Sequence, residues 1–149
     1  MRIFNPAVVP HVLVVEDDEL LRMTAVDLVC DQRLKAFEAD SADQALEMLS
    51  CHCQIGILFT DIEMPGSMDG LALAHTAKRH WPHLQHIIVS GNVLPKETAL
   101  PERASFFAKP YNPNLIGKAL RVMAGLACEH DCRDSNKHAD GFLLRKRYY

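Results

Sequence analysis

Five short apolar runs, separated by stretches of helical periodicity, constrain the fold of this chain more than any other feature. The apolar runs occupy residues 11–16, 34–40, 55–60, 85–90 and 104–108, and the helical stretches occupy 18–30, 41–50, 69–80 and 112–125. Parallel strands need long crossover connections, and strands buried on both faces read as nearly continuous apolar runs. The alternation therefore predicts an α/β fold with a five-stranded, doubly wound parallel sheet.

Local signals place the ends of several helices. Ser41 and Gln44 have the spacing of a capping box at the start of one helix. Asn112 and Pro113 have the residue types of an N-cap and a first helical position, and Gly125 is a typical stop. In the helix over 18–30 we expect one face to be made of Leu20, Leu21, Thr24, Leu28 and Val29.

Composition narrows the functional classes. A chain of 149 residues with a formal net charge of −3 fits one domain and has no overall basic field for nucleic acid or an anionic membrane. The apolar start is interrupted by Pro6, Pro10 and His11, so it resembles neither a signal peptide nor a spanning helix. The odd number of cysteines favours reduced thiols in the cytoplasm; these are Cys30, Cys51, Cys53, Cys128 and Cys132.

Polar residues collect where the predicted strands end. Glu16 and Asp17 follow the first strand, Asp61 follows the third, Ser90 ends the fourth and Lys109 follows the fifth. In a doubly wound sheet, ligands bind beyond the carboxyl ends of the strands, where the strand order reverses. We therefore expect these side chains to meet at one edge of the sheet.

The chemistry of this group favours phosphoryl transfer. Three carboxylates at close range repel one another unless a cation lies among them, and all-oxygen ligation with retained water suits Mg²⁺. A lysine and a hydroxyl are partners for an anion. Asp61 is then the candidate nucleophile, because a carboxylate can attack phosphorus to give an aspartyl phosphate.

Four motifs in the expected order carry a family resemblance. "VLVVEDDELLR", "LFTDIEMPGSMDGL", "IIVSGN" and "FFAKPY" resemble the receiver domain of bacterial two-component response regulators over roughly residues 11–125. The resemblance implies a flavodoxin-like sheet of order 2-1-3-4-5. It also implies that Asp61 accepts a phosphoryl group from a phosphohistidine on a sensor histidine kinase or a histidine phosphotransfer protein.

The resemblance implies a magnesium site at the acids. Asp17 and Asp61 would bind Mg²⁺ through their side chains, Glu16 through water and Glu63 through its backbone carbonyl.

It also implies a switch. Ser90 occupies the position of the hydroxyl that moves toward the phosphoryl group, and Phe106 that of the aromatic residue that reorients with it. From the residues alone, Phe106 fits a core aromatic equally well. Lys109 occupies the position of the phosphate-binding lysine, followed by a cis-proline at Pro110.

Two spacings depart from the family pattern. The segment from Asp61 to Gly70 is one residue longer than usual. The segment from Ser90 to Lys109 is about three residues shorter and contains Pro95 and Pro101. We therefore expect a short or irregular fourth helix.

The expected domain organisation has three parts: an N-terminal arm at 1–10, the receiver domain at 11–125 and a tail at 126–149 that is in part disordered. Since only the tail follows the domain, we expect a stand-alone receiver, monomeric or weakly dimeric. Its output would be phosphoryl relay or binding to a downstream protein, without direct contact to nucleic acid or membrane. The end of the tail, "FLLRKRYY", either frays or docks on a partner, an acidic surface or its own domain.

Three alternatives stay open. The "CHC" and "CEHDC" segments offer zinc ligands, although their spacing fits no standard zinc site. A Mg²⁺-dependent phosphohydrolase would use Asp61 as nucleophile and Glu63 as general acid. A degenerate receiver would bind partners without phosphorylation. We favour a phosphoacceptor switch whose only enzymatic activity is its own phosphorylation and dephosphorylation.

Overall fold

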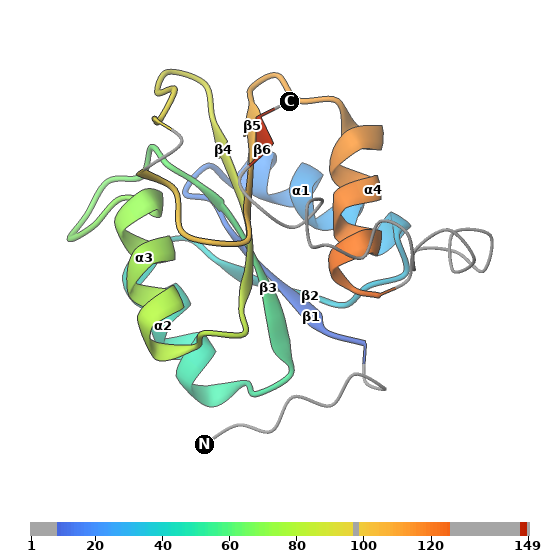
Figure 1. The fold of residues 1–149 in the computed structure, drawn as a ribbon, viewed down its shortest axis with the longest axis horizontal. Helices are drawn as coiled ribbons and strands as arrows, with labels where there is room; N and C mark the ends of the chain where they lie inside the picture. Colours follow the sequence, from blue (N-terminus) through green and yellow to red (C-terminus); the bar gives the residue numbers. More distant parts are fainter. Residues whose placement is uncertain (1–8, 97–98, 126–146, 149) are drawn as a thin grey trace.

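A computed structural model describes residues 9–96, 99–125 and 147–148. The sheet is parallel throughout and has the order β2-β1-β3-β4-β5-β6. Its strands are β1 (His11–Val15), β2 (Ala36–Ala39), β3 (Ile55–Asp61), β4 (Gln85–Ser90), β5 (Ala104–Ala108) and β6 (Arg147–Tyr148) (Figure 1). The predicted order 2-1-3-4-5 is confirmed, and β6 extends the sheet beyond it.

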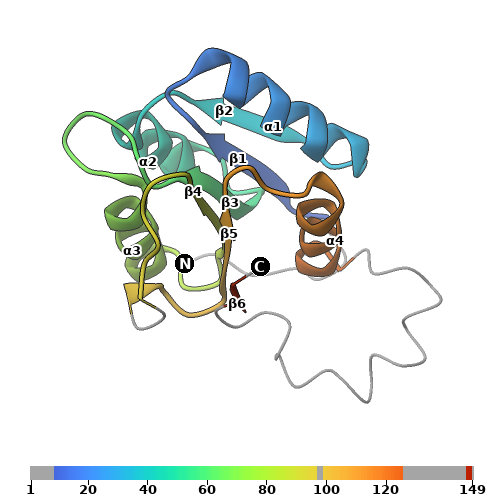
Figure 2. The same cartoon turned by 90° about the horizontal axis from the view of Figure 1, so that it is seen from above.

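Within the described residues, four α-helices lie on the two faces of the sheet. They are α1 (Glu19–Asp31), α2 (Ala42–Cys51), α3 (Gly70–His80) and α4 (Pro113–Met123). Helices α1 and α4 cover one face and α2 and α3 cover the other (Figure 2). Each face encloses its own buried apolar cluster, so the central strands β1, β3 and β4 are packed on both sides. This arrangement fixes the strand ends that carry the site.

Side-chain caps begin all four of these helices. The capping residues are Asp18, Ser41, Asp69 and Asn112, whose side chains accept hydrogen bonds from backbone amides in the first turn. The predicted pairing of Ser41 with Gln44 is present, although the Gln44 side chain accepts from the amide of Asp40, one residue earlier than in a capping box. Gly125 ends the last helix with a positive φ of 71°.

The predicted apolar face of α1 is wrong in its first turns. The helix buries Ala25, Leu28 and Val29, whereas Leu20 is 75% exposed and Leu21 is 47% exposed. At about 100° per residue, Leu20 and Val29 lie about 180° apart and cannot share a face. The start of α1 therefore presents apolar side chains to solvent beside the carboxyl ends of the strands.

The connection from β4 to β5 contains no α-helix in its described part, residues 91–96 and 99–103. This agrees with the expectation of a short or irregular fourth helix, and the helix after β5 is therefore the fourth α-helix among the described residues. Pro95 and Leu100 are buried and anchor the connection. No helix in the described ranges is long and apolar enough to cross a membrane.

The end of the tail joins the sheet. Arg147 and Tyr148 pair in parallel with Ser105 and Phe106 of β5. The expectation of a frayed terminus is therefore wrong for these two residues, and docking on the chain's own domain is the alternative that holds for them. Residues 126–146 lie outside the described part of the chain.

Candidate functional site

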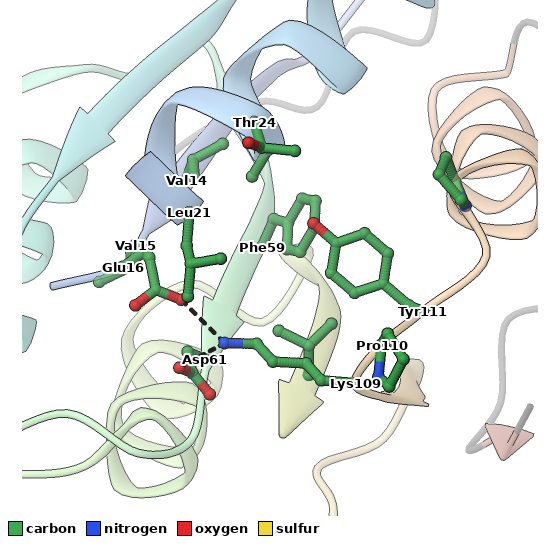
Figure 3. A pocket seen from close by; sticks show the side chains of 13 residues that line it. Val14, Val15, Glu16, Leu21, Thr24, Phe59, Asp61, Lys109, Pro110 and Tyr111 are labelled. Atoms are coloured by element: carbon green, nitrogen blue, oxygen red, sulfur yellow. Dashed lines mark hydrogen bonds and ion pairs between the residues drawn. The ribbon is translucent and has the colours of Figure 1, made fainter. Parts of the chain in front are cut away.

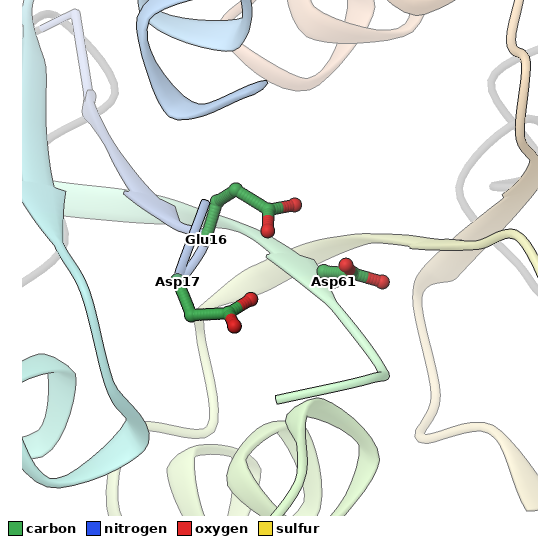
Figure 4. Close-up of side chains that lie close together, drawn as sticks. All are labelled: Glu16, Asp17 and Asp61. Atoms are coloured by element: carbon green, nitrogen blue, oxygen red, sulfur yellow. The ribbon is translucent and has the colours of Figure 1, made fainter. Parts of the chain in front are cut away.

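Three acids lie together where β1 and β3 end. Glu16 and Asp17 follow β1, and Asp61 is the last residue of β3 (Figure 4). Each offers a carboxylate oxygen, and these oxygens all lie within 4.8 Å of one another. Glu16 and Asp61 are buried, whereas Asp17 is exposed. The predicted convergence of the acids is present, with one of them open to solvent.

Lys109 reaches these acids from the end of β5. Its Nζ lies 2.8 Å from Asp61 Oδ2 and 3.1 Å from Glu16 Oε2 (Figure 3). The peptide between Lys109 and Pro110 is cis, as the family resemblance implies. A lysine that bridges two buried carboxylates from separate strands is positioned as part of a site and is not a surface charge.

The electrostatics of the acids favour a cation. Burial raises the pKa of Glu16 to about 7 despite the hydrogen bond from Lys109, and the charge of Asp61 adds to the rise. Burial also raises the pKa of Asp61, which Lys109 opposes. The pKa of Lys109 is raised because its hydrogen bonds to Asp61 and Glu16 outweigh its own desolvation. One ammonium is thus shared by carboxylates that are poorly solvated.

Ser90 lies at the end of β4, and its hydroxyl donates a hydrogen bond to Oε1 of Glu63. The same oxygen accepts from the backbone amides of Asn92 at 2.9 Å and Val93 at 3.1 Å. Burial alone would raise the pKa of Glu63, but hydrogen bonds with Asp61, Ser90 and Asn92 lower it to about 2. The predicted metal role of the Glu63 backbone carbonyl stays a prediction.

Phe106 is almost fully buried in the apolar cluster under α2 and α3. This position fits the core role that the sequence allows for it. Its role as a switch residue stays a prediction.

Two residues that support the site were missed in the sequence. Arg22 Nη1 donates to the backbone carbonyl of Glu16 at 2.9 Å, which holds the end of β1. Gly70 packs so closely on the chain that a Cβ there would lie 1.6 Å from the carbonyl oxygen of Asp61. The "DG" pair after the longer loop marked a helix start, but no sequence signal revealed this approach.

A cavity of about 420 Å³ opens beside Lys109, between α1 and the segment from β5 to α4 (Figure 3). Its walls are mainly apolar and include Leu21, Phe59 and Tyr111, while Asp61 and Lys109 lie at one side. The rings of Phe59 and Tyr111 meet edge to face with centroids 6.2 Å apart. The edge that carries the acids and Lys109 is therefore bordered by an apolar recess.

The zinc alternative gains no support from the described residues. In that part of the chain, the acids Glu16, Asp17 and Asp61 form the one group of potential metal ligands. Cys30, Cys51 and Cys53 are exposed free thiols. Cys128 and Cys132 lie outside the described residues.

The sequence matches the family described as "Response regulator receiver domain" over residues 12–121. The two-component response regulator ORR11 of Oryza sativa subsp. indica is 28% identical over 114 residues, which cover 73% of this chain and 77% of the relative. The sensor kinase CckA of Brucella abortus is 27% identical over 116 residues, which cover 75% of this chain but only 12% of the kinase.

Solved structures agree with these matches. A response regulator receiver protein from Pseudomonas putida is 29% identical, with a TM-score of 0.66 and coverage of 74% of this chain and 93% of that chain. A receiver protein from Sinorhizobium medicae has a TM-score of 0.72, with coverage of 78% and 94%, at 20% identity. The second likeness supports the fold alone.

Proposed function

The chain belongs to the response regulator receiver domain family, and from this we propose that it is a two-component switch in which Asp61 accepts a phosphoryl group from a phosphohistidine. A sensor histidine kinase or a histidine phosphotransfer protein would be the donor. The receiver domain would span residues 11–125, and its output would be a changed interaction with a downstream protein.

The observation that carries this proposal is the bridge from Lys109 to Asp61 and Glu16. In the transfer, an Asp61 carboxylate oxygen forms a bond to phosphorus while the phosphorus–nitrogen bond of the phosphohistidine breaks, and its electron pair stays on the imidazole. The ammonium of Lys109 is within reach of the oxygens that gain charge. The protein's contribution is thus positioning and charge neutralisation.

Glu16, Asp17 and Asp61 fit Mg²⁺ because they supply only oxygen ligands, and Asp17 keeps the site open to water. Bound Mg²⁺ would neutralise phosphoryl oxygens. The raised pKa values of the buried Glu16 and Asp61 support a cation at this position, because a nearby positive charge favours the ionised carboxylates.

An apolar surface beside the site supports a protein as donor. Leu20, Leu21 and Met23 in the first turns of α1 are exposed, and Leu21 also lines the cavity next to Lys109. Exposed apolar side chains grouped at a reactive edge are typical of interaction sites. We propose that the phosphohistidine protein docks on this surface.

The phosphohydrolase alternative is less well supported. A general acid must carry a proton, but the pKa of Glu63 is lowered to about 2 by its hydrogen-bond partners. Glu63 is therefore ionised at neutral pH. We propose a phosphoacceptor switch, acting in the cytoplasm, whose chemistry is limited to gain and loss of its own phosphoryl group.

The test is incubation with acetyl phosphate and Mg²⁺, followed by intact mass measurement. The wild type should gain one phosphoryl group and Asp61→Asn should gain none. Asp27→Asn, an exposed acid of α1, is the matched control and should label like the wild type. Label on Asp61→Asn would remove Asp61 from its role, absence of label on all proteins would favour the degenerate receiver, and multiple turnover of phosphate esters would favour the phosphohydrolase.

A further inference from the structure

The carboxylate of Glu63 is the acceptor for a turn that follows β4. One oxygen, Oε1, receives hydrogen bonds from the hydroxyl of Ser90 and from the amides of Asn92 and Val93. The amide of Val93 also lies 2.8 Å from Ser90 Oγ. We call residues 90–93 the donor turn. A hydroxyl and consecutive backbone amides that converge on one charged oxygen form the type of concavity that binds anions.

Ser90 lies close to Asp61 across the sheet, because Asp61 of β3 pairs with Val89, the residue before Ser90. Glu63 is tied to Asp61, because its backbone amide lies 3.3 Å from Asp61 Oδ1. A serine hydroxyl has only one proton and can donate it to one acceptor at a time. While Glu63 holds that proton, the Ser90 hydroxyl cannot donate to a phosphoryl oxygen. The carboxylate and the phosphoryl group are therefore competitors for the same donor.

We propose that Glu63 is an internal ligand of the donor turn. The Glu63 carboxylate holds the turn in the unphosphorylated protein and leaves it when the aspartyl phosphate takes the Ser90 hydroxyl. This inference rests on the proposed role of Asp61. Glu63 is a positioning residue in this scheme, because it acts on the phosphoryl group only through Ser90 and the turn.

Charge gives the exchange its direction. A phosphoryl group on Asp61 brings more negative charge next to the Glu63 carboxylate, and like charges at close range repel. Glu63 is only half-buried, so its side chain has solvent to enter when it leaves. The phosphoryl group then takes the Ser90 hydroxyl, and the exposed amides of Asn92 and Val93 can donate to solvent, so no buried donor is left unsatisfied.

The donor turn links this exchange to the surface. Val93 is 43% exposed and the next residue, Leu94, is 75% exposed. No α-helix encloses this segment among the described residues of the β4–β5 connection. A change in how the turn is held therefore alters an exposed apolar surface, which is the kind of surface that a downstream protein binds.

The first experiment needs no phosphorylation. Amide hydrogen exchange at Asn92 should accelerate by about tenfold in Glu63→Ala, because its amide loses a charged acceptor, and exchange at Val93 should accelerate less, because its amide keeps Ser90 Oγ as an acceptor. Asp43→Ala is the matched control, since Asp43 is an exposed acid that holds the neighbouring loop through Ser67. It should leave exchange at Asn92 and Val93 unchanged. Unchanged exchange in Glu63→Ala would overturn the proposal.

The second experiment measures competition. Beryllium trifluoride, which binds carboxylates as a phosphoryl stand-in, is titrated into the full chain with Mg²⁺. Its affinity should rise about fivefold in Glu63→Ala, because Ser90 becomes free to bind it. In a Ser90→Ala background the same substitution should give a smaller rise, because only the removal of a repelling charge remains. Equal binding in Glu63→Ala would show that the carboxylate does not compete, weaker binding would show that it assists the phosphoryl group, and either result would overturn the proposal.

Glu63→Gln is the second variant if Glu63→Ala does not fold. It keeps the size and one acceptor oxygen but loses the charge, so smaller changes in the same directions are expected and no change in either would overturn the proposal. Failure of the proposed function has a different signature. In that case beryllium trifluoride would bind none of the proteins, while hydrogen exchange would still report on the hold of Glu63.

Discussion

Replacing His86 with leucine should make the fold less sensitive to acid. His86 lies in the middle of the sheet, where β4 pairs with β3 and β5, and its side chain is fully buried. Neither ring nitrogen has a hydrogen-bond partner among the described residues. The pKa of His86 is lowered from 6.5 to about 3, mainly by burial and to a smaller extent by the charges of Lys78 and His75.

The size of the effect follows from the two pKa values. In the unfolded chain His86 takes up a proton below pH 6.5, whereas in the folded protein it stays neutral down to about pH 3. The unfolded state therefore binds more protons in this window, so the free energy of unfolding decreases as the pH falls. From pH 8 to pH 5 the expected loss from His86 alone is about 2 kcal/mol, and it approaches about 5 kcal/mol below pH 3.

The assay is urea denaturation of wild type and His86→Leu at pH 8 and pH 5. The difference in unfolding free energy between the two proteins should shift by about 2 kcal/mol in favour of the variant at the lower pH. At pH 8 leucine should be at least as stable, because it removes two buried polar atoms without partners. His80→Leu, at an exposed histidine of α3, controls for the loss of an imidazole. A difference that stays constant between the two pH values would refute the reasoning.

Two further predictions test the proposed phosphoacceptor site around Asp61. In Gly70→Ala the new Cβ would lie 1.6 Å from the carbonyl oxygen of Asp61, so the end of β3 must move. The rate of labelling by acetyl phosphate should therefore fall at least about tenfold. A normal rate would show that the contact is relieved without moving Asp61. Mg²⁺ at ten times its dissociation constant should raise the free energy of unfolding by about 1.4 kcal/mol, as measured by urea denaturation. Asp17→Asn should reduce this gain, and an undiminished gain would place the ion elsewhere.

The sheet and the acidic site were largely predictable from the sequence because both depend on regular geometry. Buried parallel strands leave apolar runs in the sequence, and their carboxyl ends share one edge of the sheet. Glu16, Asp61 and Lys109 therefore meet although they lie far apart along the chain. The helix ends at Ser41 and Asn112 follow from local hydrogen bonding, which a sequence also records.

Contacts between irregular segments were not predictable. Glu63 lies in the loop after β3 and Ser90 is the last residue of β4, and neither residue type indicates that the two side chains pair. Gly70 matters because of the backbone that it approaches, which no sequence pattern encodes. A histidine within an apolar strand suggests a buried hydrogen bond, yet neither ring nitrogen of His86 has a hydrogen-bond partner among the described residues. The pairing of β6 with β5 rests on a tertiary contact and leaves no periodic pattern.

Charge imbalance connects the stability of the site with its chemistry. Glu16, Asp17 and Asp61 bring three negative charges to one edge when ionised, and Lys109 supplies one positive charge there. Burial makes the ionised forms of Glu16 and Asp61 costly, as their raised pKa values indicate. A divalent cation would stabilise the ionised carboxylates and leave one Asp61 oxygen able to attack phosphorus. The close approach of three carboxylates is therefore unfavourable without a cation. The same carboxylates would favour binding of a divalent cation, which in turn would favour a phosphoryl group on Asp61.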